Sequence, residues 1–370
     1  MAIGYACQVP VFRYALERWT PDFYEVVATP GSNGFTEAEK EALALLESLR
    51  TSEDVPVNFT LREETNENPG GALHVFYPGK IPGLPTAPIW SGELTESTAR
   101  SLVDSPVRRE LAKRILEGQS AIWVIVESGN AEADDEAEKL IEQAARRAEE
   151  NLRIPEGVVG RNEIAAGAPL PHDRENILQS DVPLKIEFSL LRVSRNDPAE
   201  ALFLPMLLKL EDDLHEWAEE PMAFPVFGRG RVLEPLIGKG INEANVLEYS
   251  GYLCGACSCE VKDQNPGMDL LLAVNWDAAI AGSEVIIEKV LPPLEGTSVL
   301  LGASPEVKDG EKPINEAGTG QSATEQPEPD ASEPGESRDS KTYLSLGISL
   351  AVVLLLLGVG SMVILRGGRK

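Results

Sequence analysis

Three cysteines lie close together in the stretch Cys254-Gly-Ala-Cys257-Ser-Cys259, and they form the densest group of reactive side chains in the chain. The remaining cysteine is Cys7. Such a group supports three chemistries: disulfide bonding in an oxidising compartment, metal binding, and thiol–disulfide exchange. The sequence leaves all three open.

Each chemistry makes a different demand on these cysteines. As disulfides, two of the three would pair, or one would reach Cys7. As a metal site, the three thiolates suit Zn²⁺ or Cu(I), and the fourth ligand of zinc would be Cys7 or His215, neither at a recognisable spacing. As a redox pair, Cys254 and Cys257 would exchange disulfides, but they lie at the end of a predicted helix, where the helix dipole disfavours a thiolate.

The other residues with chemical potential do not assemble into a motif. The histidines His74, His172 and His215 lie outside any nucleophile or His-Glu-x-x-His pattern, so we expect them in packing or surface roles. The glycine-rich stretches 228–231 and 238–240 lack the length and the Lys-Ser/Thr ending of a phosphate loop. We therefore predict no catalytic residue and no cofactor apart from such a metal, and an enzymatic activity is not favoured.

The elements that would position these residues begin with an α/β unit at 22–118. An apolar strand is predicted at 24–29 and a helix at 36–49, with Thr36 as N-cap and Glu39 in the capping-box position. The unit continues with predicted strands at 55–61, 73–77 and 89–91 and predicted helices at 96–103 and 105–116, the last with Ser105 as cap and Pro106 in the first turn.

A second α/β unit, at 119–302, carries the cysteines. It opens with the apolar stretch 121–127, which is typical of a buried parallel strand, and a long amphipathic helix at 134–152. Further along we predict a strand at 184–193, a helical stretch at 199–217, short strands at 226–227 and 232–233, a helix capped by Asn242, and a strand at 268–275.

This order of strand, helix, strand, helix, hairpin and helix resembles the thioredoxin fold. The stretch from 221 to 238 carries the resemblance, with a proline, a short strand that ends in Phe, a glycine turn, a second strand and a closing glycine: Pro221, Phe227, Gly230, Val232 and Gly238. The resemblance implies tandem thioredoxin-like (α/β/α) units. It also implies that Pro221 or Pro225 matches the cis-proline of that family.

The chain departs from that family where its redox chemistry would lie. A redox thioredoxin carries Cys-x-x-Cys directly after its first strand, at a helix N-terminus. Here residues 128–135 contain no cysteine and several acids, and residues 30–35 of the first unit also lack cysteine. The resemblance therefore implies a thioredoxin-like fold without the usual redox pair.

The end of the chain predicts a membrane anchor. No charged residue occurs from Tyr343 to Leu365, a run long enough to cross a bilayer. We predict a single transmembrane helix at 342–365 followed by a basic cytoplasmic tail at 366–370. By the positive-inside rule the bulk of the chain is then extracytoplasmic, at the cell surface or in the periplasm.

The segments that precede and follow the globular part are interpreted from their amino-acid sequence and composition. The stretch 303–341 is rich in Glu, Pro and Ser, which predicts a disordered acidic linker. Residues 1–21 are interpreted as the remnant of a signal peptide and an N-terminal arm, because Gly4-Tyr5-Ala6 resembles a cleavage-site end. A cytosolic tail-anchored protein is the competing interpretation.

Charge and resemblance limit the functions that we expect. With 60 acidic and 33 basic residues the net charge is -27, which disfavours nucleic acid as a partner. Stretches 7–19, 224–231 and 257–271 resemble uncharacterised exported or membrane proteins of environmental, planctomycete-like bacteria, a resemblance that implies export. We expect a membrane-anchored adaptor that binds a protein partner outside the membrane. The alternative is a thiol-redox or metal-handling protein that acts through Cys254, Cys257 and Cys259.

Overall fold

The protein is described by a computed structural model over residues 7–64, 71–79, 84–257 and 261–282. All of these residues belong to one compact unit. The predicted linker at 303–341, the predicted membrane span at 342–365, the tail at 366–370 and Cys259 lie outside the described residues. Across the ranges that are described, no helix combines the length and apolar character that a bilayer crossing requires.

The first half of the described chain forms a four-stranded mixed sheet with the order β2-β1-β3-β4. Its strands are β1 (Tyr24–Thr29), β2 (Phe59–Glu63), β3 (Ala72–Phe76) and β4 (Trp90–Glu93). Strand β1 runs parallel to β2 and antiparallel to β3, and β3 runs antiparallel to β4. Helix α2 (Glu37–Arg50) joins β1 to β2, and the predicted capping box between Thr36 and Glu39 is confirmed.

Two helices follow this sheet and form a corner. Helix α3 (Glu96–Val103) is capped by Thr95, and helix α4 (Pro106–Leu116) is capped by Ser105 with proline at its first position, as predicted. The buried Arg108 of α4 donates hydrogen bonds to the carbonyls of Ser101 and Leu102. A guanidinium at the C-terminal carbonyls of α3 satisfies acceptors that the helix itself leaves unpaired.

The second half of the described chain forms a six-stranded mixed sheet. Its main path runs β10-β8-β7-β5-β6, and β9 pairs with β7. The strands are β5 (Ala121–Val126), β6 (Phe188–Val193), β7 (Met222–Phe227), β8 (Arg231–Val232), β9 (Leu236–Ile237) and β10 (Met268–Asp269). Strand β5 is parallel to β6 and antiparallel to β7, and β7 is antiparallel to β8.

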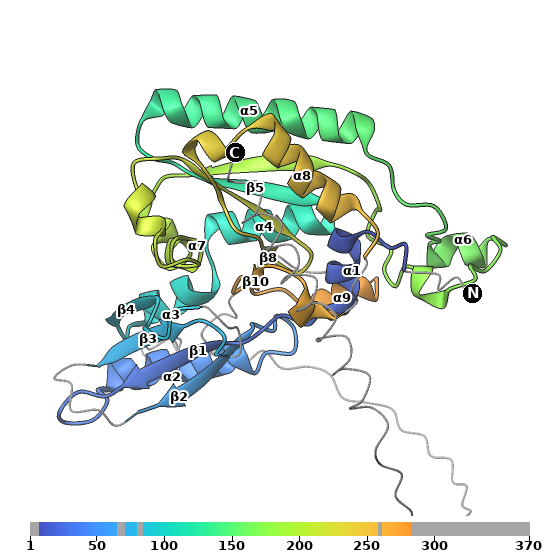
Figure 1. The fold of residues 1–370 in the computed structure, drawn as a ribbon. Helices are drawn as coiled ribbons and strands as arrows, with labels where there is room; N and C mark the ends of the chain where they lie inside the picture. The colour runs from blue at the N-terminus through green and yellow to red at the C-terminus, as the bar shows by residue number, and fades with distance from the viewer. Residues whose placement is uncertain (1–6, 65–70, 80–83, 258–260, 283–370) are drawn as a thin grey trace, which may run out of the picture. The chain divides into compact units, whose positions relative to one another are not determined.

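Strand β5 is buried on both faces, and its alternating side chains divide the core. Trp123 and Ile125 pack toward α5 (Ala131–Asn151) and α8 (Glu243–Cys254), which lie side by side over one face of the sheet (Figure 1). Ile122 and Val124 belong to the cluster that also contains the buried apolar residues of α4 and of α7 (Leu204–Leu208). This two-sided burial explains why the β5 sequence is uniformly apolar rather than alternating.

One hydrophobic cluster continues from the second sheet into the first. Polar bonds cross the same boundary. The amide of Asn58 donates to the carbonyl of Leu270 at 3.1 Å and accepts from the N–H of Leu272 at 3.0 Å. The hydroxyl of Tyr77 donates to the carbonyl of Met206 at 3.0 Å. The predicted α/β class is confirmed, with two mixed sheets and helices.

Helix α1 (Val11–Arg18) is an element that the sequence pattern did not predict. It is buried, including the ion pair between Arg13 and Glu17, whose Nε and Oε1 atoms are 2.9 Å apart. Arg13 donates to the carbonyl of Ser180 at 3.1 Å, and Glu17 accepts from the N–H of Ser180 at 3.0 Å. Because Arg13 and Glu17 occupy buried positions, the apolar residues of α1 do not show a helical period in the sequence. Ser180, which bonds to both, lies far away in the chain.

The remaining helical segments are short. They are α6 (Arg161–Ala165), α9 (Trp276–Ile280) and the 3₁₀ helices Arg174–Asn176, Pro198–Glu200, Leu214–Trp217, Gly238–Gly240 and Lys262–Gln264.

The single helix expected at 199–217 is wrong. The stretch divides into the end of a 3₁₀ helix, then α7, then the 3₁₀ helix Leu214–Trp217. Pro205 stands in the first turn of α7, because inside a longer helix it would remove a hydrogen bond and clash with the preceding turn.

Two further expectations are corrected. The strand expected at 268–275 is limited to β10, because its partner β8 is equally short; beyond it, Leu270 donates to the carbonyl of Gly230 at 2.9 Å. No cis peptide bond occurs in the described part of the chain, so neither Pro221 nor Pro225 is a cis-proline. Pro225 lies inside β7 opposite Trp123.

Candidate functional site

Two of the three clustered cysteines are described, and both are buried beside the N-terminal segment. Cys254 is the last residue of α8, and Cys257 follows shortly after. The N–H of Cys257 donates to the carbonyl of Val9 at 2.9 Å, and Cys7 belongs to the same hydrophobic cluster. The structure thus gathers Cys7, Cys254 and Cys257 in one region of the core, which the sequence spacing could not show.

The environment of Cys254 opposes reactivity. Its side chain is 2% exposed, and burial raises the pKa of its thiol to about 12, against the smaller opposite effect of a hydrogen bond with Ser120. A thiol with such a pKa is protonated at neutral pH and is a poor nucleophile.

The described residues provide no additional ligand for the metal site expected at the cysteines. His215 is an exposed residue of the 3₁₀ helix Leu214–Trp217, and its Nδ1 is 2.7 Å from the carbonyl oxygen of Asp212. Among the residues that the structure describes, no three His, Cys, Asp or Glu side chains form a group that could hold a metal ion. Cys259, the third expected ligand, lies outside the described residues.

The structure brings one histidine to a serine. The Nδ1 atom of His74 on β3 is 2.8 Å from the hydroxyl of Ser91 on β4, and the two residues are directly opposite in the antiparallel ladder. No acidic side chain bonds to this ring within the described part of the chain. Without a third group to orient the ring, the pair fits a cross-strand surface contact better than a nucleophile and its base.

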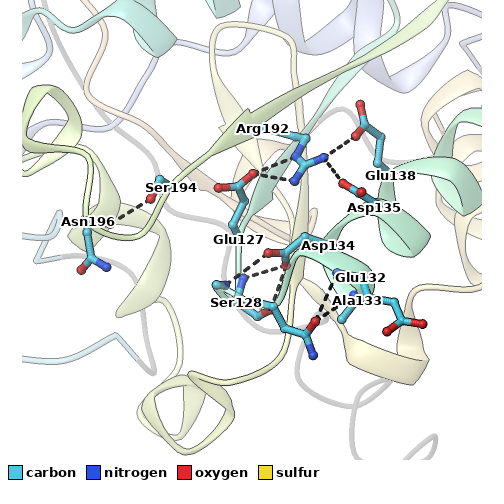
Figure 2. A network of polar contacts seen from close by, with 12 residues as sticks. Glu127, Ser128, Glu132, Ala133, Asp134, Asp135, Glu138, Arg192, Ser194 and Asn196 are labelled. Carbon is cyan, nitrogen blue, oxygen red and sulfur yellow. Dashed lines mark hydrogen bonds and ion pairs between the residues drawn. The ribbon is translucent and has the colours of Figure 1, made fainter.

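The loop between β5 and α5 is held by a network of hydrogen bonds (Figure 2). Asn130 is the N-cap of α5, and its side chain accepts from the N–H groups of Glu132 and Ala133 at 3.2 and 3.4 Å. Gly129 has a φ of +92°, a conformation that glycine adopts without strain. These residues turn the chain sharply from the strand into the helix.

Asp134, from the first turn of α5, points back into this loop. Its Oδ1 accepts hydrogen bonds from the N–H and the hydroxyl of Ser128 at 2.8 and 2.9 Å, and its Oδ2 accepts from the N–H of Gly129 at 3.2 Å (Figure 2). The side chain is buried, at 2% exposure. The chain therefore fills the donor-rich loop at this helix N-terminus with its own carboxylate.

Arg192 on β6 is held by three carboxylates beside this loop (Figure 2). Its Nε lies 2.8 Å from Oε1 of Glu127, and its Nη1 lies 2.7 Å from Oδ1 of Asp135 and 2.7 Å from Oε2 of Glu138. The hydrogen bonds that Asp135 and Glu138 accept from the guanidinium raise the pKa of Arg192. The side chains of Glu127 and Glu138 are partly exposed and that of Asp135 is exposed. The network connects α5 to β6 and to the end of β5, and each nitrogen of this guanidinium contacts a carboxylate.

Arg195, at the turn after β6, connects two other loops. Its Nε donates to the carbonyl of Glu127 at 3.1 Å, and its Nη2 donates to the carbonyl of Glu220 at 3.2 Å. Both acceptors are neutral, and burial lowers the pKa of Arg195. The turn is supported by a 3.5 Å hydrogen bond from the N–H of Asn196 to the hydroxyl of Ser194 (Figure 2). Arg195 thus holds together the loop that follows β5 and the loop that precedes β7.

A cavity of about 520 Å³ opens beside Arg195. Its apolar lining comes from Pro198 and from the stretch 199–217 that was expected to be helical, which contributes Ala201, Leu204, Pro205, Leu208 and Leu214. Its polar lining includes Arg195, Asp197, Lys209 and His215. The cavity lies past the carboxyl end of β6, which is where open α/β sheets commonly bind ligands, and its size is in the range of small-molecule sites.

Sequence reasoning did not find this cavity. Apolar residues in the stretch 199–217 predicted a helix, whereas the breaks around Pro205 and the acidic stretch 211–213 fold it into short pieces that surround a space. Two prolines, at 198 and 205, were the available signal, since each marks the start of a new helical segment.

The chain was compared with protein families, curated proteins and solved structures. No family model, curated protein or solved structure matches the chain. The candidate site is therefore interpreted from its own geometry, which offers a lined cavity and two ordered loops rather than an activated nucleophile.

Proposed function

We propose that this chain is a membrane-anchored, extracytoplasmic adaptor or binding protein with thioredoxin-like units and without the usual thioredoxin redox activity. The observation that carries the proposal is the position of Asp134. In a redox thioredoxin the loop before the first long helix presents a reactive cysteine; here the corresponding loop, between β5 and α5, receives a buried carboxylate from the chain itself.

The strand arrangement supports the thioredoxin-like part of the proposal. In the second sheet β6-β5-β7-β8 combines one parallel pair with two antiparallel pairs, and α5 and α8 cover one face. The first sheet repeats this arrangement as β2-β1-β3-β4. The same pattern in both halves supports tandem units of one fold type, although the two units share one continuous core cluster.

The absence of redox chemistry is supported by electrostatics as well as by composition. A thiol in the β5–α5 loop would face the carboxylate of Asp134, and a nearby negative charge raises a thiol pKa. The loop donors that would stabilise a thiolate, the N–H groups of Ser128 and Gly129, are already bonded to that carboxylate. The loop is built to be stable rather than reactive.

A disulfide-reduction assay tests this part. The full chain, with dithiothreitol as electron donor and insulin as substrate, should give the rate of dithiothreitol alone. The matched variant carries Cys254→Ser and Cys257→Ser. Turnover by the native chain that this variant loses would overturn the proposal and support the alternative, a thiol-redox protein acting through Cys254, Cys257 and Cys259.

The metal form of the alternative has its own measurement. Metal content of the purified full chain should be unchanged by serine at Cys254, Cys257 and Cys259. Stoichiometric zinc or copper that these substitutions remove, with circular dichroism unchanged, would favour the metal-handling function instead.

The anchoring part rests on the uncharged sequence at 343–365, outside the described residues. A chain that ends at residue 341 should leave the membrane fraction, whereas the full chain should sediment with it. Protease added to intact cells, or to cells with a permeabilised outer membrane, should digest the globular part. Protection in both preparations would support the cytosolic tail-anchored interpretation.

A further inference from the structure

The cavity beside Arg195 has a divided lining. One side is aliphatic: Leu204 and Leu214 are buried at 4% and 1% exposure, and Leu208 is half-buried. The other side is polar and carries Arg195, Lys209 and His215 against a single acid, Asp197. An apolar wall that faces cationic groups is the lining that an amphiphilic anion requires.

The cationic groups of this lining retain unused charge. Among the described residues, neither Arg195 nor Lys209 lies in an ion pair, although many arginines of the chain do. Arg195 gives its Nε and Nη2 to neutral carbonyls, and the carboxylate of Asp134 acts on it through space without an ion pair, so its charge remains available to a ligand. Asp197 already accepts a hydrogen bond from the N–H of Ala199 at 2.9 Å as the cap of a 3₁₀ helix.

The surroundings restrict the anion to a small one. Acidic residues of the same segment lie outside the described lining of the cavity: Glu211, Asp212, Asp213, Glu216, Glu219 and Glu220. With a net charge of -27 on the whole chain, these groups repel polyanions before they reach the cavity. A small anion with an aliphatic body offsets that repulsion by burying apolar surface.

The donors favour a carboxylate over a phosphate. Because Nε and Nη2 of the Arg195 guanidinium already donate to backbone carbonyls, fewer of its donors remain for a ligand, and a carboxylate has fewer oxygens and less charge to satisfy than a phosphate. Lys209 supplies an ammonium group from the rim, whereas Nδ1 of His215 already lies 2.7 Å from the carbonyl oxygen of Asp212. One carboxylate matches this set of separate donors better than a tetrahedral dianion does.

We propose that the cavity between the Arg195 turn, α7 and the 3₁₀ helix Leu214–Trp217 binds a small carboxylate with an aliphatic body. The source is either a short fatty acid or the C-terminal carboxylate of a peptide that ends in a leucine-like residue. This proposal names a ligand class for the binding role proposed above and rests on it. Redox turnover would sink the binding role without altering carboxylate binding, so the two can fail separately.

The test uses the full chain in lipid nanodiscs, with empty nanodiscs as the blank. Hexanoate is titrated and its binding is followed by saturation-transfer NMR, beside hexylamine and hexanol as probes of the same length with opposite and no charge. N-acetyl-leucine and N-acetyl-leucinamide, with and without the carboxylate, represent the peptide source. Saturable binding of hexanoate or N-acetyl-leucine, with weaker binding of its uncharged counterpart, is the expected result.

Two pairs of variants locate the site. Ala201 is exposed and has helical backbone angles, so Ala201→Trp fills the cavity without strain and should abolish saturable binding, whereas Ala199→Trp on the same turn but outside the lining should not. Lys209→Gln should weaken carboxylate binding roughly threefold, the size of an exposed charge contact. Lys239→Gln, which changes net charge equally at an exposed site outside the lining, should leave binding unchanged.

Each outcome decides the proposal. Preference for hexanoate identifies the fatty-acid source and preference for N-acetyl-leucine identifies the peptide source. Equal binding of hexanoate, hexanol and hexylamine would overturn the proposal, because the cationic lining would then select nothing. Unsaturable signal, or carboxylate binding that survives Ala201→Trp, would overturn it as well.

Discussion

The carboxylate of Asp134 accepts hydrogen bonds from both the backbone N–H and the hydroxyl of Ser128, at 2.8 and 2.9 Å. It does so while almost fully buried, and its second oxygen accepts from Gly129. The first turn of α5 thereby fixes the loop that leaves β5. This contact stabilises the loop. It also occupies the N–H donors that would otherwise stabilise a reactive anionic group at this helix N-terminus.

Removal of this carboxylate should destabilise the loop and the helix together. Asp134→Ala leaves the N–H groups of Ser128 and Gly129 without an acceptor in a poorly hydrated position. We expect the free energy of unfolding to fall by about 2–3 kcal/mol, the size of charged hydrogen bonds lost at a buried site. Urea denaturation of the full chain, followed by tryptophan fluorescence, measures the change.

The neighbouring acid supplies the control for that measurement. Asp135 pairs with Arg192, but its side chain is 69% exposed. Asp135→Ala should therefore cost less than about 1 kcal/mol, as exposed ion pairs do. Equal losses for Asp134→Ala and Asp135→Ala would contradict a special role for the buried carboxylate.

A buried ion pair between β8 and β10 should matter more than an exposed one nearby. Asp269 lies 3.3 Å from Nη1 of Arg231, with both side chains no more than 5% exposed, and it also accepts from the N–H of Asp22 at 2.8 Å and pairs with Lys262. Asp269→Ala leaves the buried Arg231 without a carboxylate partner, whereas Lys262 keeps its ion pair with Asp22, and the change should lower the free energy of unfolding by about 3–5 kcal/mol.

An ion pair with an exposed carboxylate and a mostly buried arginine is the comparison. Asp277 lies 3.0 Å from Nη1 of Arg229, but its side chain is 87% exposed. Asp277→Ala should change the urea midpoint only slightly, by less than about 1 kcal/mol in stability. A larger loss for Asp277→Ala than for Asp269→Ala would show that burial does not set the strength of these pairs.

The thiol of Cys254 should resist alkylation in the native chain. With a pKa raised by burial to about 12, its thiolate fraction at pH 8 is about four orders of magnitude below unity, and its sulfur is also shielded. Iodoacetamide followed by peptide mass spectrometry should find Cys254 unmodified under conditions that label it fully in urea. Stoichiometric labelling of the native chain would instead reveal an accessible, reactive thiol.

Local signals in the sequence were enough to predict several helices. Thr36 and Glu39 predict a capping box that the structure contains, and Ser105 followed by Pro106 predicts the start of α4. These signals work because cap and helix lie within a few residues of each other, so that no distant partner is needed. The run of apolar residues at β5 was equally informative, because only a strand buried on both faces needs it.

Features that depend on distant partners were missed. Helix α1 contains Arg13 and Glu17 at buried positions, and their charges are satisfied by residues near Ser180. The residues that precede and follow α1 in the sequence do not include these partners, so the local sequence cannot predict the contacts. The cavity was missed for a related reason. Its apolar residues follow a helical period, but the helix is interrupted at Pro205. Periodicity alone does not distinguish residues that pack in a helix interface from residues that line a cavity.

Asp134 is an intermediate case. The stretch 128–135 was correctly seen to lack cysteine and to be acidic, yet the inward direction of one acid among several could not be chosen from composition. The spacing between Ser128 and Asp134 was a local signal, since one helical turn after the Asn130 cap returns a side chain toward the loop. Burial, which decides its role, needs the packed structure.

Acidification should stabilise the chain through Glu200. Its side chain is 1% exposed, its Oε1 accepts from the N–H of Val107 at 2.8 Å, and its Oε2 has no hydrogen-bond partner in the described part of the protein. Burial raises the pKa of Glu200, and the hydrogen bonds from Ser105 and Val107 oppose that shift without cancelling it. The folded chain therefore holds this proton to a higher pH than the unfolded chain does.

The sign of the pH dependence follows from that difference. Between the unfolded pKa, about 4.3 for glutamate, and the raised folded pKa, the native state binds more protons, so this group's contribution to stability increases as the pH falls. Glu200→Gln cannot titrate. The free energy of unfolding of the native chain minus that of Glu200→Gln should therefore rise between pH 7 and pH 5, as measured by urea denaturation at each pH.

The comparison with Glu200→Gln separates this group from the other carboxylates, which titrate in both chains and cancel in the difference. Glu41→Gln, at an exposed position on α2, controls for the loss of one negative charge from an acidic protein. A difference that stays constant or falls on acidification would mean that the folded chain does not hold the Glu200 proton more tightly. The carboxylate would then gain more from the N-terminus of α4 than it loses by leaving water.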